Sequence, residues 1–200
     1  MKHVLLLLTV FSGVFANEKT DKQLNMPNDY KGRDLLVGRG AYFFFTDGTN
    51  REIWDDGTID LEIENTYWFT NYYSTFQNIN FIWKDGASSF GTPVSIDMAT
   101  ISIGVKEFFS IVPSLLNGYL GFGFTCGLVW TNNKSEFIPN HYFWASPGIV
   151  GKSGLILFAK SKVSIDIFFD AYYQPIWSGA LNSYTDMGGF RTGVGMGYLF

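Results

Sequence analysis

The chain has 200 residues, including 20 Phe, 11 Tyr, 6 Trp and 22 Gly, and its mean hydropathy is close to neutral at +0.07. Its 14 basic and 18 acidic residues give a formal net charge of −4, which argues against nucleic-acid binding because that function needs a basic surface. No apolar run reaches the roughly 20 residues that a membrane-spanning helix requires, which argues against a helical membrane protein.

The N-terminus has the pattern of a signal peptide in residues 1–16. Lys2 and His3 provide a short basic start, residues 4–10 are almost wholly apolar, and residues 13–16 supply the small side chains that a signal peptidase reads. We expect cleavage after Ala16. Residues 17–35 are polar and without periodicity, which predicts a leader with little fixed structure. The folded domain then comprises residues 36–200.

The folded domain alternates apolar and polar or small residues with a period of two, which predicts β-strands with one apolar face. We expect eight strands, at residues 38–46, 58–69, 73–83, 99–109, 118–130, 142–159, 163–174 and 188–200. The connections alternate between long ones (47–57, 84–98, 131–141 and 174–187) and shorter ones (70–72, 110–117 and 160–162). This alternation is typical of an up-and-down barrel with its loops at one end and its turns at the other.

The orientation of the strands follows from their apolar faces. In the first strand we expect Ala41, Phe43 and Phe45 to point outward and Gly40, Tyr42 and Phe44 to point inward. Three polar residues fall on the outer face: Glu107 near a strand end, and Asn65 and Gln77, which we interpret as bulges that shift the alternation. Cys126 lies on the apolar face, and we interpret it as a packed thiol.

The inner face carries charges of both signs, at Asp60, Glu62, Glu64, Lys106, Lys152, Asp166, Asp170 and Arg191. They could line a selective pore or form a paired polar core. An eight-stranded barrel is only just wide enough for its own side chains, and we expect Tyr42, Phe44, Trp68, Phe168 and Tyr172 to take up much of the space. We therefore predict a filled lumen held by ion pairs, although the sequence does not tell which acid meets which base.

The last strand carries the most specific pattern of the chain. It alternates from Gly189 and ends on an aromatic residue, Phe200, with a second aromatic residue, Tyr198, two positions earlier. Here the chain resembles the bacterial outer-membrane barrels, and over residues 36–200 it resembles their small eight-stranded group, which includes the barrels of outer membrane proteins A, X and W.

This resemblance implies an all-β, eight-stranded, antiparallel up-and-down transmembrane β-barrel in a Gram-negative outer membrane. It places both termini and the leader in the periplasm, and it makes Tyr198 and Phe200 the signal that the barrel-assembly machinery reads. The expected partners are outer-membrane lipid, lipopolysaccharide, the assembly machinery and periplasmic chaperones, and the expected state is a monomer. We expect no peptidoglycan-binding domain after the barrel.

A soluble carrier of the lipocalin kind is the main structural alternative, because alternation alone does not say which face points inward. Strand glycines opposite the apolar face, such as Gly121 and Gly123, suit a narrow filled lumen better than an exposed surface. The first strand also lacks the Gly-x-Trp common in lipocalins.

Catalysis and cofactor binding have little support. His141, the one His beyond the signal peptide, has no Ser two residues later, and one His with one Cys makes no metal site. We interpret the Asp and Gly residues of the loop at 47–57 as turn-forming residues, with a calcium site as a remote alternative. We predict a non-catalytic structural or surface-interaction protein without cofactors, with a narrow porin or hydrophobic-solute channel as the alternative. The loop aromatics Trp54, Phe137 and Trp177 suit a membrane interface or a binding patch equally well.

Overall fold

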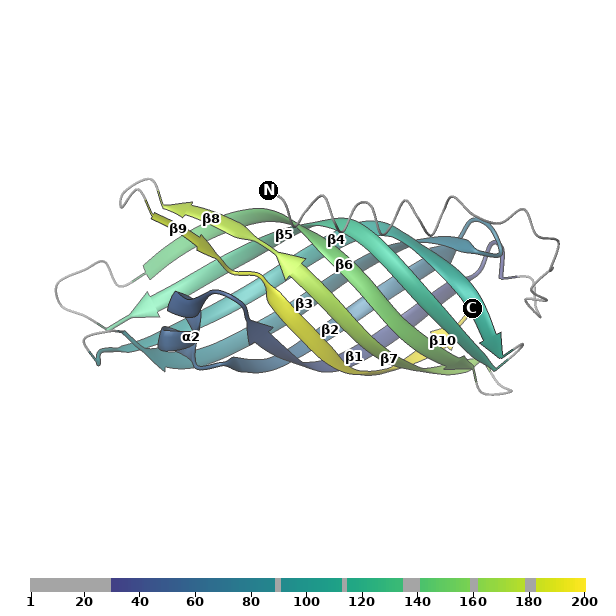
Figure 1. The fold of residues 1–200 in the computed structure, drawn as a ribbon, viewed down its shortest axis with the longest axis horizontal. Helices are drawn as coiled ribbons and strands as arrows, with labels where there is room; N and C mark the ends of the chain where they lie inside the picture. The colour runs from purple at the N-terminus through teal and green to yellow at the C-terminus, as the bar shows by residue number, and fades with distance from the viewer. Residues whose placement is uncertain (1–29, 89–90, 113–114, 135–140, 159–161, 179–182) are drawn as a thin grey trace.

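The computed structural model describes residues 30–88, 91–112, 115–134, 141–158, 162–178 and 183–200. They form a closed antiparallel barrel with the strand order β1-β10-β7-β6-β5-β4-β3-β2 (Figure 1). The strands are β1 (Asp34–Phe45), β2 (Gly57–Trp68), β3 (Tyr73–Ala87), β4 (Pro93–Val112), β5 (Leu116–Asn133), β6 (His141–Phe158), β7 (Val163–Tyr173) and β10 (Gly189–Leu199). The predicted eight-stranded up-and-down barrel is confirmed. The signal peptide and residues 17–29 of the leader lie outside the described residues.

Pairing between the first and last strands closes the barrel. β1 and β10 pair without interruption from Leu35 with Leu199 to Phe45 with Gly189. The start of β1 and the end of β10 therefore lie at one end of the barrel, called here the terminal end. The opposite loop end carries α2 (Gly48–Trp54) and a separate hairpin of β8 (Pro175–Ser178) and β9 (Ser183–Asp186) (Figure 1). Within the described part of the chain, no helix is both long and apolar enough to cross a membrane.

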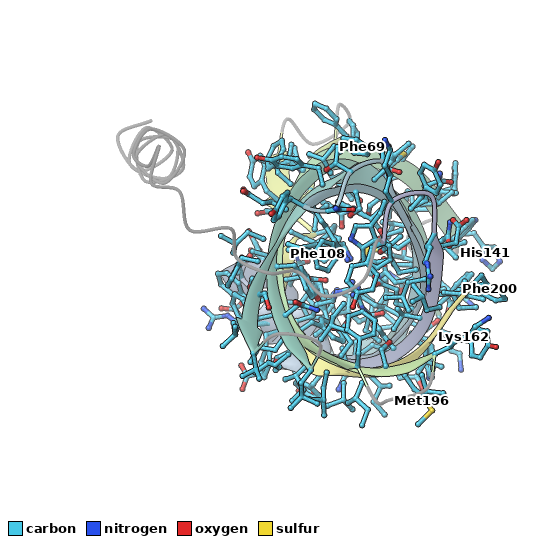
Figure 2. The ribbon with its side chains drawn as sticks, turned by 90° about the vertical axis from the view of Figure 1, so that its right-hand side faces the viewer. Phe69, Phe108, His141, Lys162, Met196 and Phe200 are labelled. Carbon is cyan, nitrogen blue, oxygen red and sulfur yellow. The ribbon has the colours of Figure 1, made fainter. Side chains whose placement is uncertain are left out.

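The outside of the barrel is apolar. Ile63, Phe124 and Val194 are 58%, 68% and 61% exposed, and the intervening residues of their strands point inward. Figure 2 looks into the terminal end and shows Phe108 pointing into the ring of strands, while Met196 and Phe200 point away from it. A closed sheet satisfies its backbone hydrogen bonds internally, so such a surface can face hydrocarbon.

The orientation of β1 is opposite to the predicted one. Phe43 and Phe45 are buried in the lumen, whereas Tyr42 and Phe44 point outward and are each 42% exposed. Four consecutive aromatic residues give no contrast between the two faces, so apolarity alone does not set the phase of this strand. Its only charged interior residue, Arg39, does set it, because Arg39 shares a face with Phe43 and Phe45.

Several predicted loops contain regular structure. The expected loop 84–98 is mostly an extension of β3 and β4, which pair as far as Ala87 with Pro93. The loop 47–57 contains α2, and the loop 174–187 contains the β8–β9 hairpin. In β4 the apolar residues of the extension, such as Ile96 and Met98, lie on the inner face, whereas those of the belt lie on the outer face, so the alternation changes phase while the pairing continues.

The polar residues of the outer face do not mark bulges. Asn65 lies directly opposite Gln77 in an uninterrupted β2–β3 ladder, and its Nδ2 donates to Asp34 Oδ1 at 3.1 Å near the terminal end. The register shift lies elsewhere, between Ser110 and Val112 in β4. Cys126 is on the outer face as predicted, but it is exposed there rather than packed within the protein.

Candidate functional site: a charged lumen between two apolar seals

The middle of the lumen holds a cluster of charged side chains, each at most 4% exposed. The cluster comprises the eight predicted residues, Asp60, Glu62, Glu64, Lys106, Lys152, Asp166, Asp170 and Arg191, together with Arg39, which the predicted orientation of the first strand placed on the outer face. They project from β1, β2, β4, β6, β7 and β10, so the network joins strands from every side of the barrel. We call these nine residues the lumen network.

Arg191 on β10 connects the acids of two different walls. Its Nε and Nη2 donate to Asp170 Oδ2 at 3.0 and 2.7 Å, and its Nη1 donates to Asp60 Oδ2 at 3.1 Å. Its Nη2 also donates to Glu62 Oε2. A planar guanidinium with five N–H donors can satisfy several carboxylates at once, which a point-like ammonium does less well.

Arg39 on β1 does the same on the terminal side of the network. Its Nη1 donates to Glu62 Oε1 and Glu64 Oε2, both at 2.7 Å, and its Nε donates to Asp166 Oδ2 at 2.7 Å. The Tyr119 hydroxyl donates to Asp166 Oδ1 at 3.2 Å. The sequence does contain a signal for the inward orientation of Arg39. An arginine on the lipid face of a barrel destabilises the protein by about 2–4 kcal/mol at mid-bilayer, so an arginine in the middle of a strand is expected to point inward.

The two lysines complete the network from β4 and β6. Lys152 Nζ donates to Glu64 Oε2 at 2.9 Å, to Asp170 Oδ2 at 3.2 Å and to Glu62 Oε1 at 3.3 Å, and Lys106 donates to Glu64 Oε1. Gly121 lies between the lysines on β5. A Cβ there would sit 2.8 Å from Lys106 Cγ, so the glycine makes room for both side chains.

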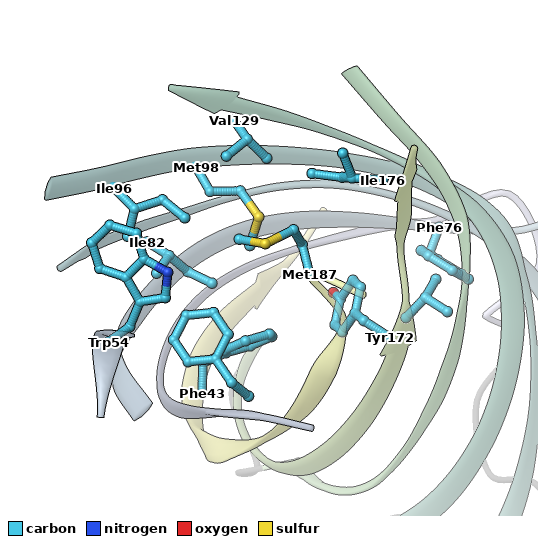
Figure 3. Packing of buried hydrophobic residues seen from close by; sticks show 12 residues of the cluster. Phe43, Trp54, Phe76, Ile82, Ile96, Met98, Val129, Tyr172, Ile176 and Met187 are labelled. Carbon is cyan, nitrogen blue, oxygen red and sulfur yellow. The ribbon is translucent and has the colours of Figure 1, made fainter. Parts of the chain in front are cut away.

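An apolar cluster, the loop-end seal, fills the lumen on one side of the network (Figure 3). It consists of Phe43, Phe45, Trp54, Phe76, Ile82, Ile96, Met98, Val129, Val150, Tyr172, Ile176 and Met187. Trp54, predicted as a loop-tip aromatic, is instead 4% exposed within this seal. Phe137 and the side chain of Trp177 lie outside the described residues.

The helix α2 is fixed over the loop end by polar contacts. Asp47 caps its N-terminus by accepting from Thr49 N at 2.9 Å and Asn50 N at 3.2 Å, so this Asp serves the turn as expected. Asn50 Nδ2 donates to Asp186 O at 2.8 Å, which ties α2 to β9. Gly86 on β3 allows the helix to approach, because a Cβ there would meet Ile53 O at 2.1 Å.

A second cluster, the terminal-end seal, lies on the other side of the network. It consists of Tyr30, Leu35, Val37, Trp68, Phe108, Tyr119, Ile156, Phe158, Phe168 and Leu199. Trp68, Phe168 and Tyr172 therefore occupy the lumen as predicted, whereas Tyr42 and Phe44 do not. Together the seals separate the lumen network from bulk solvent.

Tyr30 closes the terminal end from outside the strands. Its ring stacks on Trp68 of β2 at 5.4 Å and on Phe158 of β6 at 5.3 Å. These two strands are four places apart in either direction around the barrel, so Tyr30 bridges opposite walls. Burial raises the pKa of its phenol, although a side-chain hydrogen bond with Asn117 acts against this shift. The end of the expected unstructured leader is thus part of the folded barrel.

Other predicted positions form no site. His141 is exposed at the start of β6, opposite Asn132. Among the described residues, no three or more His, Cys, Asp and Glu side chains are grouped so as to hold a metal ion.

Several solved structures of outer-membrane proteins resemble this barrel. Neisserial surface protein A is 13% identical with a TM-score of 0.64, and the match covers 85% of this chain and 100% of that one. OprG from Pseudomonas aeruginosa is 13% identical with a TM-score of 0.64, covering 86% and 97%. Ail, the attachment invasion locus protein of Yersinia pestis, solved with the heparin analogue sucrose octasulfate, is 15% identical with a TM-score of 0.56, covering 85% and 99%.

The chain has the fold of the small eight-stranded outer-membrane barrels. The resemblance inferred from its last strand is therefore confirmed at the level of fold. No protein-family model and no curated protein matches the sequence.

In this barrel the two predicted signal residues lie at the terminal end of the outer face. Tyr198 and Phe200 are 45% and 62% exposed, with ring centroids 5.0 Å apart, and Phe200 N donates to Asp34 O at 2.8 Å. Both side chains are accessible from the outside of the last strand.

Replacing Arg191 with Met should destabilise the barrel by about 3–5 kcal/mol, because it leaves Asp60 and Asp170 buried with fewer partners. Urea unfolding in detergent measures this loss. Arg51→Met, at an exposed position on α2, is the matched control and should leave the midpoint nearly unchanged. An Arg191→Met midpoint equal to that of the parent would show that the lumen is wet rather than paired.

Replacing Tyr30 with Ala should open the terminal end to water. The readout is thiol labelling of a Ser164→Cys probe, buried near this end of β7, in a Cys126→Ser background. Labelling should accelerate about tenfold or more, because a loss of ~1.4 kcal/mol in the free energy of opening changes the open population tenfold. Tyr30→Phe retains the ring stacking, so the Ser164→Cys probe should be labelled slowly in this control. Equal labelling rates in Tyr30→Ala and Tyr30→Phe would show that the Tyr30 ring does not close the terminal end.

Proposed function

We propose that this protein is an integral outer-membrane β-barrel with a filled, non-catalytic lumen and a structural or surface-interaction role. The observation that carries the proposal is the continuous filling of the lumen by the loop-end seal, the lumen network and the terminal-end seal. A barrel filled in this way offers no path for solutes and no open site for a substrate.

The outer-membrane location is supported by three independent features. The outside of the barrel is apolar, the fold is that of outer-membrane proteins, and the sequence begins with a signal-peptide pattern. The proposed surroundings are outer-membrane lipid and lipopolysaccharide. The proposed assembly partners are periplasmic chaperones and the barrel-assembly machinery, and we propose a monomer.

The surface role rests on the loop end. There the strands β3 to β5 extend past the apolar belt and surround a groove of about 220 Å³, lined by Asp85, Gly86, Pro93, Val94, Ser95, Asn132 and Lys134. The groove is polar and carries charges of both signs, so it suits a polar partner. One protein of the same fold, Ail, is an attachment protein by name, which favours this role over a purely structural one.

A planar-bilayer measurement tests the filled lumen directly. The refolded mature chain should insert without unitary conductance, because ion pairs and aromatic side chains occupy the lumen. Insertion can be verified independently by a change in gel mobility on heating, which detergent-resistant barrels show. Steady single-channel steps from the parent would favour the narrow-porin alternative. Recovery of the native chain in the soluble periplasm would favour the lipocalin alternative.

Deleting Phe200 should reduce assembly in cells much more than it reduces folded stability. The side chain is exposed at the terminal end and packs mainly on Tyr198, so few folded contacts are lost. We expect a lower outer-membrane level of the deleted chain and nearly normal refolding in detergent. Phe200→Tyr keeps a terminal aromatic residue and should assemble normally. Equal membrane levels of deleted and intact chains at native expression would refute the proposed signal.

A further inference from the structure

The lumen network contains one more negative than positive charge. Among the buried side chains that the structure describes, four are cations and five are carboxylates, which leaves a formal charge of −1. An unpaired charge away from water is strongly unfavourable, and both ends of this lumen are sealed by apolar clusters. The interior therefore needs one further positive charge.

Asp60 is the least compensated of the five carboxylates. Glu62 and Glu64 each form ion pairs with three cations, whereas Asp60 forms one, with Arg191. Asp166 also pairs with one cation, but both of its oxygens accept hydrogen bonds. Asp60 accepts only through Oδ2, and its Oδ1 has no hydrogen-bond partner although the residue is fully buried. The Oδ1 of Asp170 is also without a partner, but Asp170 forms ion pairs with two cations, Lys152 and Arg191.

The neighbouring amide of Asn80 indicates that a hydrogen-bond donor is missing between the two side chains. Asn80 on β3 donates from Nδ2 to Asp60 Oδ2 at 3.0 Å, and its own Oδ1 also has no partner. Two side chains joined by one hydrogen bond thus present two unsatisfied acceptors. A carboxylic acid and an amide satisfy each other with two bonds when the acid carries a proton, because its O–H then donates to the amide oxygen.

We propose that Asp60 binds one proton in the folded barrel and is held as a neutral carboxylic acid by Asn80. The proton supplies both the missing charge of the lumen network and the missing donor of this pair. The surrounding charged and titratable groups are Glu62 on β2, Lys152 on β6, Asp170 and Tyr172 on β7, and Arg191 on β10. Folding at neutral pH then takes up one proton.

A metal cation fits the same position less well. Hard cations such as Ca²⁺ take about six to eight oxygen ligands. The unpartnered side-chain oxygens on this part of β2 to β4 are Asp60 Oδ1, Asn78 Oδ1, Asn80 Oδ1 and Thr100 Oγ1, fewer than such a cation takes, and the Arg191 guanidinium already binds Asp60 Oδ2. A proton needs only one acceptor, which Asn80 provides.

Infrared spectroscopy of the refolded barrel tests the proposal. The parent should show the carbonyl stretch of a protonated carboxylic acid at neutral pH, and Asp60→Asn should lose this band. Asp170→Asn is the matched control at the other acid bound by Arg191, and it should keep the band. Urea unfolding should show Asp60→Asn as stable as the parent and Asp170→Asn less stable, because only the second substitution removes a charge that the network needs.

The parent spectrum keeps the test decisive even if a variant does not refold. Absence of the acid band in the parent, or its persistence in Asp60→Asn, overturns the proposal. If the parent lacks the acid band and its stability rises with sodium or potassium at constant ionic strength, the missing positive charge is a bound cation and the proposal is wrong. Equal destabilisation of Asp60→Asn and Asp170→Asn would also overturn it, because Asp60 would then act as a charged member of the network.

Discussion

The constraint on which this structure depends is the neutralisation of charge in a lumen that is sealed from bulk solvent. Lipid surrounds an outer-membrane barrel and eight strands leave an interior only as wide as its own side chains, so charged residues inside must satisfy one another. Arg39 and Arg191 accomplish this by bridging acids on different walls, and both reach Glu62 through different oxygens. The same network that compensates the charges therefore ties β1, β2, β7 and β10 together across the space that would otherwise be a pore.

The seals make that network possible, and they depend on residues outside the regular barrel. Tyr30 precedes the first strand and bridges β2 and β6, while Trp54 belongs to a helix that lies between β1 and β2 in sequence and is held by β9. Their apolar side chains exclude water from both ends, which strengthens the ion pairs between them and raises the cost of leaving any one of them unpaired. Closure and charge pairing thus support each other.

Much of the fold could be predicted because strict alternation fixes both the strand and its orientation, as in β2, β7 and β10. Alternation does not give the orientation of β1, because both faces are aromatic from Tyr42 to Phe45. The wrong orientation placed Arg39 on the outer face. Alternation also failed beyond the apolar belt, where the apolar residues of β4 switch to the inner face, at Ile96 and Met98, while the pairing with β3 continues. The ion-pair partners could not be predicted at all, since Arg39 and Asp166 are 127 residues apart and meet only through the closure of the barrel and the tilt of its strands. Nothing local to Tyr30 indicates its partners, which lie 38 or more residues away in sequence.

A double-mutant cycle on Arg39 and Asp166 tests the central claim that the lumen is dry and held by mutual compensation. Each single change, Arg39→Met or Asp166→Asn, leaves an uncompensated partner, whereas the double change removes one charge of each sign. We predict that the double variant unfolds in urea with a free-energy loss smaller than the sum of the single losses by more than about 1 kcal/mol. Losses that add to within about 0.5 kcal/mol would contradict it, because charges surrounded by water do not depend on one another in this way.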